Sequence, residues 1–148
     1  MRAHKRERGS SLPETAMVMG ALLALIFGII DFGRATYTYS FVAQVARQGA
    51  RWAIVRGSSC TALDHCNASQ NDIANYVQSL NQGVTKSSGF ITTALWGNCP
   101  PGSSSNNAPG CTVTVTVKYP FSFMLPFMPN GSLATVNMVS ASQMVISQ

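Results

Sequence analysis

The chain has 148 residues, of which 46% are hydrophobic and only 10% are charged, whereas an ordinary soluble domain has about 25% charged residues. No carboxylate follows Asp72, which argues against paired-acid hydrolysis, calcium-binding EF-hands and magnesium-dependent phosphoryl transfer, because all three need clustered acids. The formal net charge of +5 is concentrated in residues 1–9, which carry +3, and the other basic residues form no recognisable nucleic-acid-binding signature. His4 and His65 have no metal-ligand spacing. We therefore expect no nucleic-acid partner, no metal, no other cofactor and no small-molecule substrate.

The most apolar stretch of the chain consists of sixteen uncharged residues, Thr15–Ile30, between two acids. A membrane-spanning helix needs about 20 residues, and the apolar residues on either side of this stretch lengthen it toward that value. Basic residues in residues 1–9 precede it, and positive charge favours the cytoplasmic side of a membrane. The sequence therefore predicts a single-pass membrane segment with a cytoplasmic N-terminus, and a translocated remainder after Asp31.

Three kinds of processing compete for this N-terminus. A signal peptide would be cleaved near Ala35, where the neighbouring charges Asp31 and Arg34 disfavour the site. The tetrapeptide Leu12-Pro13-Glu14-Thr15 before the apolar run resembles a sortase signal. We discard this interpretation because such a signal belongs at the C-terminus, with basic residues after its apolar run. The third possibility is a short basic leader that ends with cleavage between Gly9 and Ser10, so that the apolar helix is retained.

Glu14 becomes the fifth residue of the mature protein if that leader is removed. A carboxylate near a bilayer is unfavourable without a partner, and the new α-amino group of a neighbouring subunit would supply one. The alternative is that Glu14 only interacts with the positive end of the helix dipole, worth about 0.3–1 kcal/mol. The residues alone leave these two interpretations open.

Helical periodicity continues beyond the apolar segment and predicts one helix from about Glu14 to Val55, roughly 60 Å long at 1.5 Å per residue. Its second half has one apolar strip, formed by Val42, Ala46, Gly49 and Ala53, with Phe41, Val45 and Trp52 beside it. A second helix is expected to begin at Asn71 or Asp72 as its cap. Its apolar face contains Ile73, Val77, Leu80 and Val84.

Three segments have the composition or the alternation of strands: Phe90–Trp96, Cys111–Tyr119 and Leu133–Ile146. The last two are expected to form an antiparallel pair. Between them lies Pro120–Ser132, which is too long and too apolar for an ordinary hairpin loop. It either folds under the head or forms an exposed adhesive tip.

The four cysteines all follow the apolar segment, as is typical of disulfides in an oxidising compartment. Pairing sequence neighbours, Cys60 with Cys66 and Cys99 with Cys111, would close two loops, although sequence alone permits three connectivities. The tripeptide Asp64-His65-Cys66 does not predict a catalytic thiol, because adjacent side chains cannot form the spatial arrangement that such chemistry requires.

The segment Gly9-Ser10-Ser11-Leu12-Pro13-Glu14 resembles the prepilin-peptidase site of type IV pilin-like proteins. The segments Ile29–Arg34 and Ala46–Arg51 are similar to those of TadE-like minor pilins from bacterial tight-adherence (Flp) pilus systems. The resemblance is specific over residues 9–57. It implies leader removal by a prepilin peptidase, a retained N-terminal helix, and a role in pilus assembly at the inner membrane, with other pilin-like subunits and the assembly machinery as partners.

Together these observations predict an α+β fold: a long N-terminal helix, half transmembrane, packed on a small antiparallel sheet of three or four strands with one further helix. The expected organisation is a leader over residues 1–9, a helix over 10–56 and a periplasmic or extracellular head over 57–148. The expected function is that of a structural minor pilin or pseudopilin, not an enzyme. The alternatives are an unprocessed single-pass envelope protein with a ligand- or partner-binding head, and a small secreted enzyme.

Overall fold

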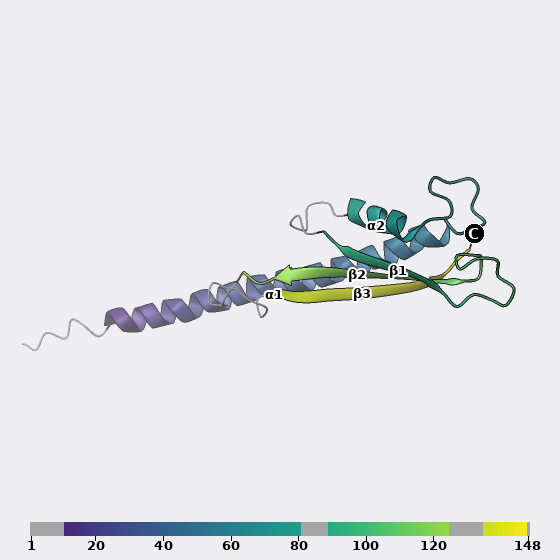
Figure 1. The fold of residues 1–148 in the computed structure, drawn as a ribbon. Coiled ribbons are helices and arrows are strands. Elements are labelled where there is room, and N and C mark those ends of the chain that lie inside the picture. The colour runs from purple at the N-terminus through teal and green to yellow at the C-terminus, as the bar shows by residue number, and fades with distance from the viewer. Residues whose placement is uncertain (1–10, 81–88, 125–134, 148) are drawn as a thin grey trace, which may run out of the picture.

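The computed structural model describes residues 11–80, 89–124 and 135–147. Within them the chain forms two helices, α1 (Ser11–Ile54) and α2 (Gln70–Ser79), and three strands, β1 (Ile91–Gly97), β2 (Thr112–Ser122) and β3 (Thr135–Val145). Among the described residues, the first half of α1 extends beyond the other elements, and its second half runs along the head (Figure 1). The predicted α+β fold, with its long N-terminal helix, antiparallel sheet and one further helix, is confirmed.

The sheet has the order β1-β2-β3, and both neighbouring pairs are antiparallel. In β2, Val113, Val115 and Val117 are fully buried, while the threonines between them are less buried. This alternation places the valines on the face that α1 covers, because successive side chains of a strand point to opposite faces. The predicted antiparallel pairing of the last two strands is confirmed: Thr112 lies opposite Val145, and Ser122 lies opposite Thr135.

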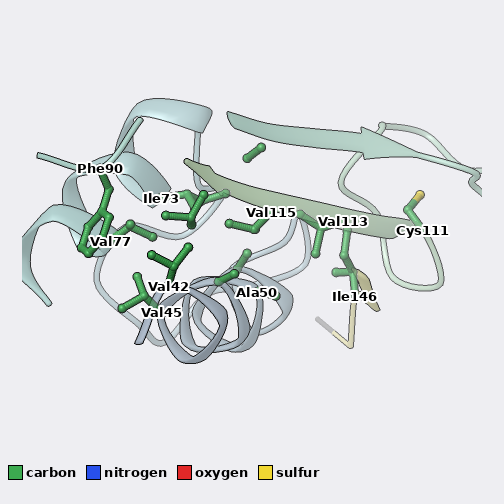
Figure 2. Close-up of a cluster of buried hydrophobic side chains, with 14 of the residues drawn as sticks. Val42, Val45, Ala50, Ile73, Val77, Phe90, Cys111, Val113, Val115 and Ile146 are labelled. Atoms are coloured by element: carbon green, nitrogen blue, oxygen red, sulfur yellow. The ribbon is translucent and has the colours of Figure 1, made fainter. Parts of the chain in front are cut away.

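The hydrophobic core lies between this sheet face, the second half of α1 and α2 (Figure 2). Small residues of α1 let the elements approach closely: a Cβ atom at Gly49 would lie 2.9 Å from Val77 Cγ2 and 3.3 Å from Val115 Cγ1. Val77 of α2 thus lies near both α1 and β2. The buried apolar residues of α1 are Val42, Val45, Ala46, Gly49, Ala50 and Ala53.

Helix α2 begins earlier than its expected cap. The N-cap is Ser69, whose side chain accepts a hydrogen bond from the Asp72 N–H, while the Asp72 carboxylate accepts one from the Ser69 N–H. The prediction of Asn71 or Asp72 as the cap was wrong, because an acid three residues after a serine completes a reciprocal capping box. Ile73 and Val77 are buried as predicted, and Val84 lies outside the described residues.

Strand β2 continues through Pro120 to Ser122, beyond the predicted end at Tyr119. The pairing of β1 with β2 reaches only to Ile91 opposite Lys118. Pro120, which has no N–H, therefore lies where β2 has lost one neighbour, a position that tolerates proline. Of the apolar stretch over residues 120–132, only Pro120–Met124 is described, with Phe121 buried and Met124 exposed; its remainder lies outside the described residues.

Candidate functional site

The first half of α1 exposes its apolar side chains along and around the helix. Leu12, Met17, Leu25 and Ile29 are all more than half exposed. Among the residues that the structure describes, α1 is the one helix long and apolar enough to cross a membrane. Its segment from Leu12 to Ile30 is about 28 Å long at 1.5 Å per residue, close to the roughly 30 Å hydrocarbon core of a bilayer. This half of the helix is compatible with single-pass membrane anchoring.

Glu14 lies in the first turn of this helix and is exposed. A carboxylate at this position interacts favourably with the unpaired N–H groups and the positive dipole end of the helix. The predicted cleavage residues, Gly9 and Ser10, lie outside the described residues. Pairing of Glu14 with a neighbouring subunit stays a prediction, because it involves a second chain.

A buried carboxylate marks the point where the exposed half of α1 ends and the head begins. Asp31 is 3% exposed. Its Oδ1 accepts a hydrogen bond from Arg34 Nη1 at 2.9 Å, and its Oδ2 accepts one from the backbone N–H of Met124, also at 2.9 Å. The Arg34 guanidinium lies 5.4 Å from the centre of the Phe121 ring. These contacts, which we call the Asp31 clasp, join the helix to a segment 93 residues away in sequence.

The Asp31 clasp lies beside a shallow pocket of about 290 Å³. Phe27, Ile30, Asp31 and Met124 line it. The pocket therefore lies at the edge of the apolar half of α1. The sequence analysis used Asp31 as the boundary of the apolar stretch, as a charge beside a poor cleavage site and as part of the TadE-like segment, and it missed the contact with Met124. The sequence does show a carboxylate in an apolar helix, which suggests that the carboxylate has a partner. It does not identify that partner as the backbone N–H of Met124.

The far end of α1 packs against α2 through aromatic side chains. The rings of Trp52 and Tyr76 stack with centroids 5.1 Å apart, and the Arg56 guanidinium lies 4.2 Å from the centre of the Trp52 ring. Beside them, Trp52, Tyr76 and Asn75 line a small hollow with His65 and Asp72, of about 200 Å³. The stacking fixes the orientation of α2 against the end of α1.

The Asp72 carboxylate in this hollow is already engaged in the capping box. Hydrogen bonds from the side chain and backbone of Ser69 lower the pKa of Asp72 below its ordinary value, and His65 contributes a smaller lowering. His65 Nδ1 lies 3.7 Å from Asp72 Oδ1. The described residues contain no group of three His, Cys, Asp or Glu side chains placed to hold a metal ion. Ser69 and Asp72 therefore serve as the N-terminal cap of α2.

Two disulfides close the loops at the distal end of the head. Cys60 is joined to Cys66, and Cys99 to Cys111. The first loop is also held by Arg56, whose Nε donates a hydrogen bond to the Asp64 carbonyl at 2.9 Å. Because Cys66 is in a disulfide, the tripeptide at residues 64–66 contains no free thiol. The structure does not bring the cysteines together with Glu14, which lies at the opposite end of α1.

These features define a class of protein: a small disulfide-containing α+β head carried on an unbroken helix whose first half is apolar and exposed. Residues 9–51 match the family model of TadE-like proteins, which identifies this stretch as a TadE-like segment and confirms the resemblance seen in the sequence. The match covers the whole apolar half of α1 and most of the half that packs in the core. TadE-like proteins form a structural, non-enzymatic family. No curated protein and no solved structure gives a significant match to the chain.

Proposed function

We propose that this protein is a minor pilin or pseudopilin that takes part in the assembly of a tight-adherence pilus while anchored in the bacterial inner membrane. The observation that carries the proposal is the coincidence of the TadE-like segment with α1. One helix has an apolar exposed half suited to lipid or to neighbouring helices, and a second half built into the head. Such a subunit needs no catalytic residue, since its function is to occupy a place in an assembly.

The N-terminal leader, in this proposal, is removed by a prepilin peptidase between Gly9 and Ser10. Cleavage leaves Glu14 in the first turn of the mature helix, close to the new terminus. The carboxylate of Glu14 then pairs with the α-amino group of a neighbouring subunit. Its exposure and its position at the start of α1 support this role.

The head, over residues 57–148, faces the periplasm or the outside of the cell in this proposal. Both disulfides lie within it. Disulfides persist in oxidising compartments such as the periplasm and are rare in the cytoplasm. The basic residues before the apolar segment favour the same orientation, with the N-terminus on the cytoplasmic side.

The first test is the N-terminus of the protein recovered from the native cell envelope, determined by intact mass and terminal peptide sequencing. We expect the chain to start at Ser10. A start at Met1 would support a static single-pass anchor instead, and a start at Thr36 would refute retention of the helix in the membrane.

The second test addresses the role of Glu14 in assembly. Glu14→Ala and Glu14→Gln are both expected to reduce co-purification with other pilin-like subunits, because neither side chain carries the charge that the α-amino group needs. The matched control is Glu7→Ala, which removes a carboxylate from the proposed leader. If Glu14→Gln assembles as well as the unmodified protein, the charge pairing is wrong.

A further inference from the structure

The hollow between the end of α1 and the start of α2 is built from three segments of the chain. It is lined by Trp52 of α1, by His65 of the loop closed by a disulfide, and by Asp72, Asn75 and Tyr76 of α2. His65 and Asn75 are exposed, so the hollow is open to solvent. Its volume of about 200 Å³ is smaller than the roughly 300–1,000 Å³ of sites for drug-sized ligands. A ligand that fits it is therefore a single small ring.

One oxygen of the Asp72 carboxylate has no role in the capping box. Both hydrogen bonds from Ser69 go to Oδ2, from the backbone N–H at 2.9 Å and from the hydroxyl at 2.7 Å. Oδ1 accepts no hydrogen bond among the described residues, and His65 Nδ1 lies 3.7 Å from it, beyond hydrogen-bond distance. The Asp72 side chain is 32% exposed. A ligand in the hollow can therefore reach a carboxylate oxygen that is available as an acceptor.

Three further side chains of the hollow have unused hydrogen-bonding groups. Among the described residues, the indole N–H of Trp52, the amide of Asn75 and the hydroxyl of Tyr76 form no hydrogen bond. These groups are accessible to solvent, since the described buried polar atoms without a partner belong to Thr92 and Ser105. An indole only donates, whereas an amide and a hydroxyl both donate and accept. The hollow thus presents donors and acceptors together.

The walls of the hollow are aromatic and are held in place by contacts within the head. The rings of Trp52 and Tyr76 stack with centroids 5.1 Å apart, and the His65 ring lies 6.5 Å from that of Trp52. The Cys60–Cys66 disulfide closes the loop that carries His65. Because these side chains are already ordered, binding of a ligand costs little conformational entropy.

The charges around the hollow favour a neutral ligand. Asp72 contributes a negative charge, and the Arg56 guanidinium, 4.2 Å from the centre of the Trp52 ring, contributes a positive one. Arg56 also occupies the position over the Trp52 ring that a cationic ligand would take. Neither an anion nor an ammonium group is therefore attracted by a net charge at this place.

We propose that the hollow binds one sugar ring of a carbohydrate without transforming it. Sugar hydroxyls both donate and accept, so neighbouring hydroxyls can donate to Asp72 Oδ1 and to the Asn75 carbonyl and can accept from the Trp52 indole. The apolar C–H groups of the ring suit the aromatic walls.

The position of the hollow makes it accessible to carbohydrate outside a membrane. Trp52 lies 21 residues after Asp31 in the same helix, about 32 Å farther along its axis. The hollow is thus well separated from the apolar half of α1. The proposal does not rest on the proposed function, because a pilus subunit and a static membrane anchor would carry the same head.

The test is titration of the full-length protein with monosaccharides, followed by the fluorescence of Trp52. The chain contains two tryptophans, so Trp96→Phe leaves Trp52 as the single indole reporter. Micelles of a polyoxyethylene detergent hold the protein, because detergents with sugar headgroups would compete. The probes are glucose, galactose, mannose and N-acetylglucosamine. We expect saturable binding of at least one of them in the millimolar range, as the affinity per atom of small ligands indicates.

Two substitutions in this background test whether the sugar binds in the hollow. Asp72→Asn removes the charge of the acceptor and should weaken binding at least about tenfold, as for a hydrogen bond to a charged group. Asn75→Ala should weaken it about twofold to tenfold, as for a neutral hydrogen bond. Asn75→Ala leaves the capping box intact, so it is informative even if Asp72→Asn loosens the start of α2. The matched control is Asn137→Ala, which removes an exposed amide from β3 and should leave binding unchanged.

Three results would overturn the inference. The first is that none of the four sugars changes the fluorescence of Trp52. The second is equal binding of sugar to the Asp72→Asn and Asn75→Ala variants, which would place the site elsewhere. The third is that choline, added as a cationic probe, binds more tightly than any sugar. Each result leaves the N-terminal cleavage and the membrane anchoring untouched, so failure here is distinct from failure of the proposed function.

Discussion

The two halves of α1 share one secondary structure and have opposite surroundings. From Leu12 to Ile30 the large apolar side chains are exposed, while from Val42 to Ala53 one strip of the helix is buried in the core. Both halves contain many apolar residues, but only the second half also carries arginine and glutamine side chains. The arrangement differs accordingly: apolar residues surround the first half, and in the second half they repeat on one face. The first pattern suits lipid and the second suits a single protein neighbour.

Glycine has a different role in each half. Gly20, Gly28 and Gly33 have open space where a Cβ atom would lie, whereas Gly49 has two valine side chains there. Packing among the described parts of the chain therefore does not require glycine at these three positions. Small residues permit close approach between helices in membranes. These glycines therefore leave room for the helix of another subunit to approach closely.

The largest expected difference between the regions concerns core packing. Ile73→Ala, at a fully buried position in α2, is expected to lower the free energy of unfolding of the head by about 2–5 kcal/mol. Ile29→Ala, at a position 64% exposed in the first half of α1, should leave it unchanged. Chemical denaturation of both variants in detergent micelles measures the effect. Equal destabilisation would contradict the division of α1 into two environments.

A charge placed in the apolar half of α1 should affect membrane insertion and not the stability of the head. Leu23→Arg places a charge near the middle of the apolar half, at an expected insertion cost of about 2.5–3.5 kcal/mol. The fraction of protein that resists alkaline extraction from membranes should fall, while the unfolding of the head stays the same. Gln44→Arg, at an exposed position of the second half, is the matched control. Retention of Leu23→Arg in the membrane at the level of this control would argue against the predicted span.

The glycines provide a smaller and more local test. Gly49→Ala forces a methyl group against Val77 and Val115, and overpacking of this kind costs about 1–3 kcal/mol. Alanine's better helix propensity, worth up to about 1 kcal/mol, offsets part of that cost. Gly33→Ala has the same propensity gain without the contact, so it should stabilise the helix or leave it unchanged. Thermal unfolding of the two variants distinguishes them, and a stabilising Gly49→Ala would show that the close approach does not constrain the core.

The smallest expected effect depends on pH and is confined to the head. Because hydrogen bonds from Ser69 lower the pKa of Asp72, the ionised carboxylate stabilises the folded state. This contribution is complete above the unfolded pKa of about 3.9 and is lost as the pH falls through the lower folded pKa. Asp72→Asn should flatten the acid side of the stability profile below about pH 4, as measured by denaturation at a series of pH values. An unchanged profile in Asp72→Asn would mean that the capping box does not contribute.

Sequence patterns predicted the elements of this fold because each element has a local period. The apolar run and the strip from Val42 to Ala53 indicated α1, and the alternation of valine and threonine indicated β2. The cap of α2 was missed because Ser69, Asn71 and Asp72 are all good capping residues, and only the reciprocal hydrogen bonds distinguish them. Local sequence preferences were sufficient to predict the helices and strands, but they were not sufficient to predict the residues at which these elements begin and end.

The candidate site was predicted less completely, for a physical reason. Glu14 and the apolar helix are visible in sequence because their properties depend on near neighbours. The Asp31 clasp depends on Met124, 93 residues away, and no local pattern encodes a hydrogen bond to a backbone N–H across that separation.

The continuity of α1 has a mechanical consequence. The helix has 44 residues without a break. One stiff rod about 66 Å long therefore joins the membrane anchor to the head. With a pivot at Asp31, the end of α1 at Ile54 lies about 35 Å away. A tilt of about 20°, ordinary for a membrane helix, would therefore swing the distal end of the head sideways by roughly 12 Å. Force applied to the buried half of such a subunit is transmitted to its far tip without passing through a hinge.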